Sequence, residues 1–178
     1  MPTDAIPTPV LYLDIDGTVR QGKDDELGRF VNGPEDVRVF PEAIARMRAW
    51  KAGGGRIIGV SNQGGIALGL VEASAVIAAM NETQRQTGRL FDSIAMCQHH
   101  PDAEDPMFAR CWCRKPKPGL AIDAAIALAV RHRDYRRRGE MYPPHMALVV
   151  GDRPEDEAMA RLLDVDFEWA ADWRAGVT

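Results

Sequence analysis

The chain has 178 residues and a mass of 19.7 kDa, a size that fits one domain with a single core. Hydrophobic residues make up 46% and charged residues 27% of it, which is typical of globular proteins and excludes disordered or fibrous chains. It has 22 basic and 26 acidic residues, so the net charge is -4 and no overall positive field attracts nucleic acid.

No stretch of the sequence has the pattern of a membrane or secretory segment. The longest apolar stretch, residues 120–130, is interrupted by Asp123 and falls short of the roughly 20 residues that a membrane helix needs. Residues 1–9 contain no Lys or Arg and no apolar run of the kind found in secretory signals. We therefore expect a cytoplasmic protein without a membrane partner, and the sequence leaves its oligomeric state open.

Five short apolar segments are predicted to be buried strands. They cover residues 10–15, 56–62, 93–96, 146–152 and 167–170. Four helical patterns alternate with them, at residues 41–51, 71–87, 118–138 and 154–163. This alternation favours an α/β fold, a Rossmann-like parallel sheet with helices on both faces, formed by residues 1–178 as a single domain. Functional residues are expected at the edge where the strands end.

Polar groups suited to phosphate chemistry follow these strands in a definite order. Asp14 and Asp16 end the first strand, just before Gly17, a pattern that is also typical of an ordinary turn. Three later segments make an ordinary turn less plausible, because they supply the complementary groups for phosphate binding. The first supplies a hydroxyl and an amide, the second an ammonium, and the third a pair of carboxylates. These groups are Ser61 with Asn62, Lys115, and Asp152 with Asp156.

This order of acid, hydroxyl, lysine and acid resembles the four motifs of the haloacid dehalogenase (HAD) superfamily of phosphohydrolases, from residue 10 to about residue 163. The resemblance implies that Asp14 attacks phosphorus and becomes an aspartyl-phosphate. It implies that Asp16 protonates the leaving oxygen and later deprotonates the attacking water. Ser61 and Lys115 would hold the transferring phosphoryl oxygens.

The same resemblance implies a magnesium ion in the site. Its ligands would be the Asp14 carboxylate, the backbone carbonyl of Asp16 and the Asp152 carboxylate, with Asp156 supporting the site without contacting the ion. The ion would bridge the nucleophile and the phosphate, so that two anions can approach each other.

A second cluster has the spacing of a zinc site. Its members form two pairs with one residue between the partners: Cys97 with His99, and Cys111 with Cys113. Three thiolates and one imidazole complete the tetrahedral shell of a structural zinc ion, which would staple the loop of residues 97–113. On spacing alone His100 is a rival fourth ligand. The alternative, three reduced buried cysteines, is disfavoured because a loop containing Pro and Asp offers no core to bury them.

Two further stretches narrow the resemblance: SNQGGI at residues 61–66 and RKPKPG at residues 114–119. Together with the cysteine pairs they resemble the HAD subfamily of D-glycero-D-manno-heptose 1,7-bisphosphate 7-phosphatase and histidinol-phosphate phosphatase, and more distantly the 3'-phosphatase domain of polynucleotide kinase. This resemblance implies that Asn62 and Arg114 contact substrate. It also implies the zinc ligands Cys97, His99, Cys111 and Cys113.

The expected substrate is a small phosphorylated metabolite, such as a heptose bisphosphate. Ile15 stands where the heptose enzymes usually have an arginine, and histidinol phosphate is therefore an alternative. Few residues separate the first two motifs, so no large cap domain is expected. Residues 21–39 would instead border an open site, with Lys23, Arg29 and Arg38 as contacts for distal anionic groups.

Residues 131–138 contain five arginines. This run could grip a polynucleotide, so a polynucleotide 3'-phosphatase is an alternative enzyme, and a zinc-bearing nucleic-acid-binding module is an alternative without catalysis. The run is equally typical of a solvated helix end, where the helix dipole favours cations, and we prefer this interpretation. A binding module would also leave the ordered Asp, Ser, Lys and Asp motifs unexplained.

Overall fold

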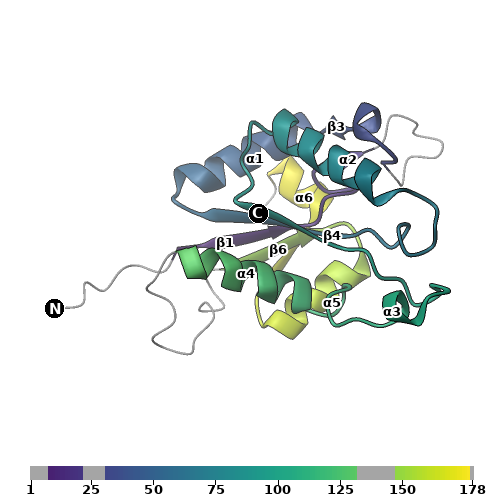
Figure 1. Cartoon of the computed structure of the whole chain (residues 1–178). Helices are drawn as coiled ribbons and strands as arrows, with labels where there is room; N and C mark the ends of the chain where they lie inside the picture. The colour runs from purple at the N-terminus through teal and green to yellow at the C-terminus, as the bar shows by residue number, and fades with distance from the viewer. Residues whose placement is uncertain (1–7, 22–30, 132–146, 177–178) are drawn as a thin grey trace.

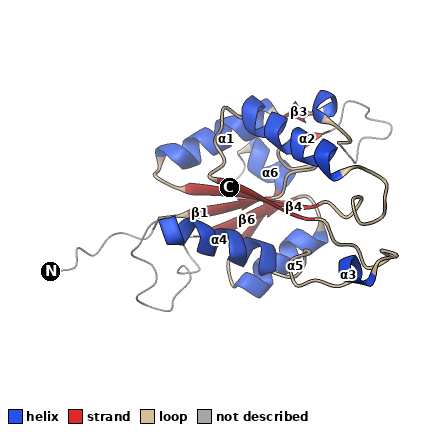
Figure 2. Ribbon diagram, viewed as in Figure 1, coloured by secondary structure: helices blue, strands red, loops and turns tan. Residues whose placement is uncertain are grey.

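Five parallel strands form the central sheet of the computed structural model, which describes residues 8–21, 31–131 and 147–176 (Figures 1 and 2). The strands are β1 (Val10–Leu13), β4 (Arg56–Asn62), β5 (Ser93–Cys97), β6 (Ala147–Gly151) and β7 (Asp166–Trp169). Their order in space is β5-β4-β1-β6-β7, so β1 lies at the centre. Every neighbouring pair in this sheet is parallel, which confirms the predicted α/β fold.

Helices cover both faces of the sheet (Figure 1). One face carries α1 (Pro41–Ala52), α2 (Ala73–Gln86) and α6 (Ala170–Ala175), and the other carries α4 (Gly119–Arg131) and α5 (Pro154–Leu163). The shorter elements are a 3-10 helix η1 (Pro34–Asp36), the helix α3 (Pro106–Ala109) and an antiparallel ribbon of β2 (Arg20–Gln21) and β3 (Arg38–Val39). Among the described residues, no helix has the length and apolar character to cross a membrane.

The side chains of β1 alternate between the two layers of the core. Leu11 and Leu13 pack with residues of α1, α2 and α6, whereas Val10 and Tyr12 pack with residues of α4 and α5. All four are buried, because a central strand of a parallel sheet has helices on both faces. The residues that follow β1 therefore start from a strand that is held on all sides.

Most predicted boundaries agree with the structure to within two residues; the first strand, predicted to reach residue 15, ends at Leu13. β4 and α5 have the predicted bounds, and α1 is one residue longer than predicted. The structure describes α4 as far as Arg131, so the rest of the predicted helix 118–138, with most of its arginine run, lies outside the described residues. Lys23 and Arg29 lie outside them as well.

Four short features were not predicted: the ribbon β2–β3, η1, α3 and α6. Elements of two to six residues are too short to show a hydrophobic period. The predicted strand at residues 167–170 is shifted by one residue, since Ala170 begins α6. Between β1 and β4, the described residues form the ribbon, η1 and α1.

Candidate active site

The carboxyl ends of β1, β4 and β6 bring the predicted catalytic residues together. Asp14 follows β1 directly, and its backbone N–H donates to the carbonyl oxygen of Val150 in β6 at 2.9 Å. Ser61 is buried at the end of β4, and Asp152 follows β6. Because these strands are parallel, the residues meet at one edge of the sheet.

Lys115 lies at the centre of this group. It is 4% exposed, and its ammonium forms ion pairs with Asp14 and, at 2.7 Å, with Asp156. It also donates to the carbonyl oxygen of Val60 at 3.0 Å. Burial alone would lower the pKa of Lys115, but the two carboxylates raise it above its ordinary value. Lys115 is therefore a fixed cation at the sheet edge, suited to bind phosphate oxygens.

Asn62 holds the backbone of Lys115. Its side-chain amide donates to the carbonyl oxygen of Lys115 at 3.1 Å and accepts from the N–H of Lys115 at 3.0 Å. These reciprocal bonds join β4 to a residue 53 positions later in the chain. They give Asn62 a supporting function that sequence reasoning missed, and its contact with substrate stays a prediction.

The Asp14 carboxylate is buried beside Lys115. Thr18 donates its hydroxyl to Asp14 at 3.2 Å, within the turn that follows β1. Burial raises the pKa of Asp14 to about 7; Lys115 opposes this increase and the Asp156 carboxylate adds to it. A desolvated carboxylate paired with a lysine is suited to act as a nucleophile once it is ionised.

The Asp16 carboxylate lies apart from that group. One of its oxygens accepts from Arg20 Nε at 2.8 Å, and the other accepts from Gln63 Nε2 at 2.7 Å and from the Ser61 hydroxyl at 3.4 Å. Gln63 Nε2 also lies 2.7 Å from Ser61 Oγ. Sequence reasoning gave Arg20 no function, although its position four residues after Asp16 was visible.

The turn between Asp16 and Thr18 requires glycine and is held from the far end of the chain. Gly17 has a φ of 92°, and a Cβ there would overlap the Asp152 side chain. Arg174 in α6 donates to the carbonyl oxygens of both Gly17 and Thr18 at 2.8 Å. Sequence reasoning missed Arg174 because it missed α6.

Three carboxylates at this edge could hold a hard cation. Oxygens of Asp14, Asp152 and Asp156 lie within 4.8 Å of one another, and Mg2+ prefers oxygen ligands. Burial raises the pKa of Asp152, with Arg153 opposing and Asp156 adding to the increase, so a bound cation would relieve the crowding of negative charge. The Asp16 side chain is not part of this set, and the backbone carbonyl of Asp16 as a ligand stays a prediction.

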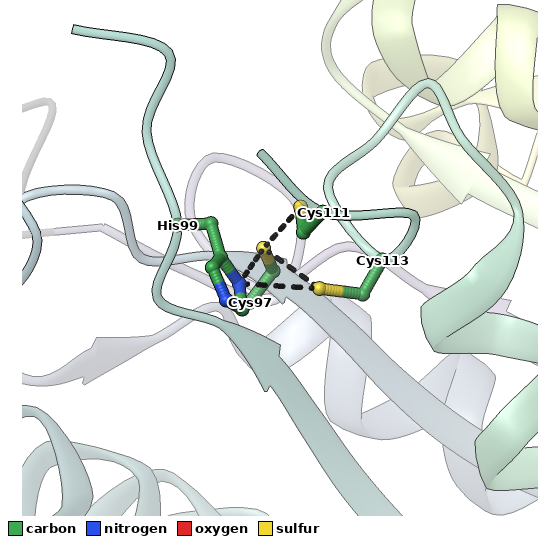
Figure 3. A group of neighbouring side chains, drawn as sticks. All are labelled: Cys97, His99, Cys111 and Cys113. Atoms are coloured by element: carbon green, nitrogen blue, oxygen red, sulfur yellow. Dashed lines mark hydrogen bonds between the residues drawn. The ribbon is translucent and has the colours of Figure 1, made fainter. Parts of the chain in front are cut away.

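The predicted zinc ligands also come together (Figure 3). Cys97 Sγ lies 3.8 Å from Cys111 Sγ and 3.2 Å from Cys113 Sγ, and His99 Nδ1 lies 3.5 Å and 3.4 Å from the sulfurs of Cys97 and Cys113. Ligand atoms of a tetrahedral zinc ion are about 3.5–3.8 Å apart, given the usual bond lengths. The donor set therefore fits a zinc ion.

His99, and not His100, joins the three sulfurs. His100 Nδ1 instead accepts from the N–H of Asp102 at 3.2 Å. The sequence carried a signal that favours His99 over His100. Side chains two residues apart in an extended chain point to the same side, and His99 is two residues after Cys97. The expectation that this loop has no core was wrong: Cys97 is 1% exposed and belongs to the core beneath α4.

Arg114, the residue before Lys115, contacts the loop that carries the predicted zinc ligands. The N–H of Arg114 donates to Cys111 Sγ at 3.3 Å. Burial alone would raise the pKa of Cys111. The N–H of Arg114 and the hydrogen bonds with Cys113 and Cys97 lower it, which favours the thiolate that a metal requires. Arg114 also donates a guanidinium N–H to the carbonyl oxygen of His99 at 3.0 Å, and its contact with substrate stays a prediction.

Comparison with known proteins identifies clear relatives, although no protein-family model matches the chain. The D-glycero-alpha-D-manno-heptose-1,7-bisphosphate 7-phosphatase of Mycobacterium bovis is 31% identical over 156 residues, which cover 84% of this chain and 70% of that protein. The D-glycero-beta-D-manno-heptose-1,7-bisphosphate 7-phosphatase of Photorhabdus laumondii is 29% identical over 161 residues, which cover 88% of this chain and 77% of that protein.

A solved structure agrees with these relatives. The D,D-heptose 1,7-bisphosphate phosphatase of B. bronchiseptica, crystallised with magnesium and phosphate, is 25% identical to this chain. The two structures align with a TM-score of 0.65 over 89% of this chain and 78% of that one.

Proposed function

The chain belongs to the heptose-1,7-bisphosphate 7-phosphatase family of the HAD superfamily and is a phosphatase, and from this premise we propose that it removes one phosphate from a heptose bisphosphate through an aspartyl-phosphate. The observation that carries the mechanism is the buried group of Asp14, Lys115 and Asp156 at the end of β1. It places a carboxylate nucleophile next to a fixed cation that can hold the anion under attack.

In the proposed reaction, an oxygen of Asp14 forms a bond to phosphorus while the bond from phosphorus to the sugar oxygen breaks. Asp16 gives its proton to that sugar oxygen, so the product leaves as an alcohol. Lys115 and the Ser61 hydroxyl hold the phosphoryl oxygens during the transfer, and both are buried at the sheet edge.

The second half of the reaction regenerates the enzyme. A water molecule attacks phosphorus through its oxygen, and the ionised Asp16 takes a proton from that water. The bond from phosphorus to Asp14 breaks, and phosphate leaves while Asp14 returns to its carboxylate form. Asp16 thus serves first as the acid and then as the base, because the loss of its proton in the first step leaves a carboxylate that can accept one in the second.

Magnesium fits this site, with the carboxylates of Asp14 and Asp152 and the backbone carbonyl of Asp16 as the proposed ligands. When bound, it supplies positive charge that offsets the repulsion between the nucleophile and the phosphate. The four residues at the zinc site are proposed to have a structural function only, because together they complete a tetrahedral shell.

The substrate is tested by comparing kcat/KM for both anomers of heptose 1,7-bisphosphate, for histidinol phosphate and for a 3'-phosphorylated oligonucleotide. We expect one heptose anomer to be the best substrate; the relatives include enzymes named for each anomer. Asp14→Asn is the matched control for contaminating activity, because the amide has nearly the same shape but is a far poorer nucleophile.

The comparison separates the substrate from the mechanism. Oligonucleotide hydrolysis that exceeds every sugar phosphate and falls steeply with added salt would contradict the heptose assignment, because salt dependence reports contacts to many phosphates. Phosphate release by Asp14→Asn at the wild-type rate would contradict the aspartyl-phosphate mechanism. A folded Asp14→Asn protein without activity would support it.

A further inference from the structure

Arg20 is a buried cation beside the active site that the proposed mechanism does not use. It is fully buried, and its Nε donates to Asp16 Oδ1 at 2.8 Å. Its Nη1 donates to the carbonyl oxygen of Ala79 at 3.0 Å and to Thr83 Oγ1 at 2.6 Å, both in α2. The guanidinium therefore joins the Asp16 carboxylate to a helix that packs on the sheet.

The backbone of Arg20 is fixed as well. Its N–H donates to the carbonyl oxygen of Ile15 at 3.0 Å, and its own carbonyl oxygen accepts from the N–H of Gly17 at 2.8 Å. Both ends of the turn after β1 thus meet at this residue. Because the backbone and the guanidinium are both held, the direction from which Arg20 reaches Asp16 is set by the fold.

This contact divides the carboxylates at the sheet edge into two groups. Asp14, Asp152 and Asp156 gather within 4.8 Å of one another, and Lys115 forms ion pairs with two of them. Asp16 is two residues from Asp14 but lies outside this set; Arg20 holds one of its oxygens, and the neutral donors Gln63 and Ser61 hold the other. Without a cation of its own, the Asp16 carboxylate would be attracted to Lys115 or to a metal ion in the same small volume.

We propose that Arg20 is a positioning residue: it keeps the Asp16 carboxylate apart from the metal-binding carboxylates and aims it at the leaving oxygen of the substrate. This inference depends on the proposed function, which assigns proton transfer to Asp16. Proton transfer requires the donor oxygen to lie within hydrogen-bond reach of the leaving oxygen, so a small displacement of Asp16 would slow the reaction.

The leaving group distinguishes this function from a general structural one. A sugar alkoxide is a poor leaving group and needs a proton from Asp16, whereas para-nitrophenolate leaves without one. The value of kcat/KM covers the steps up to release of the alcohol or phenol, so the later hydrolysis of the aspartyl-phosphate does not enter. Loss of positioning should therefore lower kcat/KM for the heptose bisphosphate more than for para-nitrophenyl phosphate.

Two variants test the contact between Arg20 and Asp16, one at Arg20 itself and one at its anchor Thr83. Arg20→Lys keeps the positive charge but loses the planar fork that reaches Asp16 and α2 together. Thr83→Val keeps both Arg20 and Asp16 but removes an anchor of the guanidinium. Thr87→Val is the matched control, because Thr87 is equally buried just after α2 and, among the described residues, its hydroxyl bonds to the backbone of Thr83 and Gln84 and not to Arg20.

We expect Arg20→Lys to lower the ratio of the two kcat/KM values, heptose bisphosphate over para-nitrophenyl phosphate, by about tenfold, and Thr83→Val by about threefold. Thr87→Val should leave the ratio unchanged. Melting temperature and zinc content establish that each variant is folded, and Thr83→Val decides the question if Arg20→Lys does not fold.

One result would overturn the inference about Arg20 but leave the proposed function intact. Both Arg20→Lys and Thr83→Val would be folded and have the wild-type ratio, while Asp14→Asn is inactive and Asp16→Asn lowers the ratio. An equal loss on both substrates would also overturn it, because that outcome indicates a structural function only. If instead Asp14→Asn or Asp16→Asn behaves like the wild type, the proposed function fails and the inference about Arg20 fails with it.

Discussion

Asp14 and Asp16 are two residues apart, yet their carboxylates have different cationic partners. Lys115 pairs with Asp14 and Arg20 pairs with Asp16, and both cations are buried. Water screens such pairs only weakly, so each carboxylate keeps its own geometry. This separation is the physical basis for proposing that one acts as the nucleophile and the other transfers protons.

The proposed zinc site also depends on single residues, and alanine replacements of His99 and of its neighbour His100 test it together. His99→Ala should lose most of the zinc, expected at about one ion per chain in the wild type, because Nδ1 of His99 is the proposed fourth ligand of the tetrahedron. Metal-binding free energy contributes to folding, so a loss of roughly 3 kcal/mol should lower the melting temperature by about 6–12 °C. Elemental analysis and thermal unfolding measure both effects.

His100→Ala is the matched control for this test. His100 is the next residue in the chain and bonds to the N–H of Asp102, not to the sulfurs. Its replacement should leave the zinc content unchanged. The assignment would be rejected if His100→Ala lost zinc while His99→Ala retained it.

At the scale of elements, one carboxylate joins the starts of β4 and β5 to the end of α1. Asp92 precedes β5, and its oxygens accept from Lys51 Nζ and the N–H of Ile57 at 2.8 Å and from Arg56 Nη1 at 2.7 Å. Burial alone would raise the pKa of Asp92, but these three bonds outweigh it and lower the pKa below its ordinary value.

Asp92→Asn should lower the free energy of unfolding by about 1 kcal/mol at pH 7, a modest value because water screens the two partly exposed cations. The pKa of Asp92 is lower in the folded state, so its ionisation favours folding above the unfolded pKa of about 3.9. This contribution is lost as the pH falls through the folded-state pKa. Urea unfolding of both proteins between about pH 7 and pH 3 should show the difference shrinking.

Glu82→Gln is the control for a carboxylate outside such a junction. The partly buried Glu82 carboxylate accepts from Arg85 and Gln86 of its own helix, and Arg85 is exposed, so its replacement should change stability less than Asp92→Asn does. A difference between Asp92→Asn and wild type that stays constant down to pH 3 would contradict the role given to the ionised carboxylate.

At the scale of the whole molecule, α6 closes the structure onto the turn that follows β1. Arg174 donates to the carbonyl oxygens of Gly17 and Thr18, residues 157 and 156 positions away, and its guanidinium lies 4.2 Å from the centre of the Phe40 ring. The last described helix, α6, therefore supports the turn that carries the proposed catalytic residues Asp14 and Asp16.

Arg174→Gln should lower kcat/KM about tenfold, because the turn that carries Asp14 and Asp16 loses a support and the carboxylates are less well placed. The free energy of unfolding should fall by about 1–2 kcal/mol, from two charge-assisted hydrogen bonds and the ring contact. Steady-state kinetics and urea unfolding measure the two effects separately.

Arg161→Gln is the corresponding control in α5. Arg161 is an exposed residue that pairs with Glu157 one turn away, so its replacement should change neither quantity measurably. Wild-type kcat/KM in a folded Arg174→Gln protein would show that the turn keeps its geometry without α6.

The sequence by itself determined the features that depend on neighbouring residues. The bounds of β4 follow from a short apolar run, and those of α5 follow from Pro154 and the acids of its first turn. The order of the motifs and the parallel sheet likewise predicted that Asp14, Ser61 and Asp152 would meet at one edge. These are local patterns, which periodicity and caps report directly.

Only the tertiary structure decided which side chains pair across that edge. Asn62 holds the backbone of Lys115, Arg20 is anchored on α2, and Arg174 reaches Gly17, although each pair is more than fifty residues apart in the chain. Their contacts depend on the order β5-β4-β1-β6-β7 and on how the helices pack over it. No local period carries that information, because side chains distant in sequence meet only after the sheet has assembled.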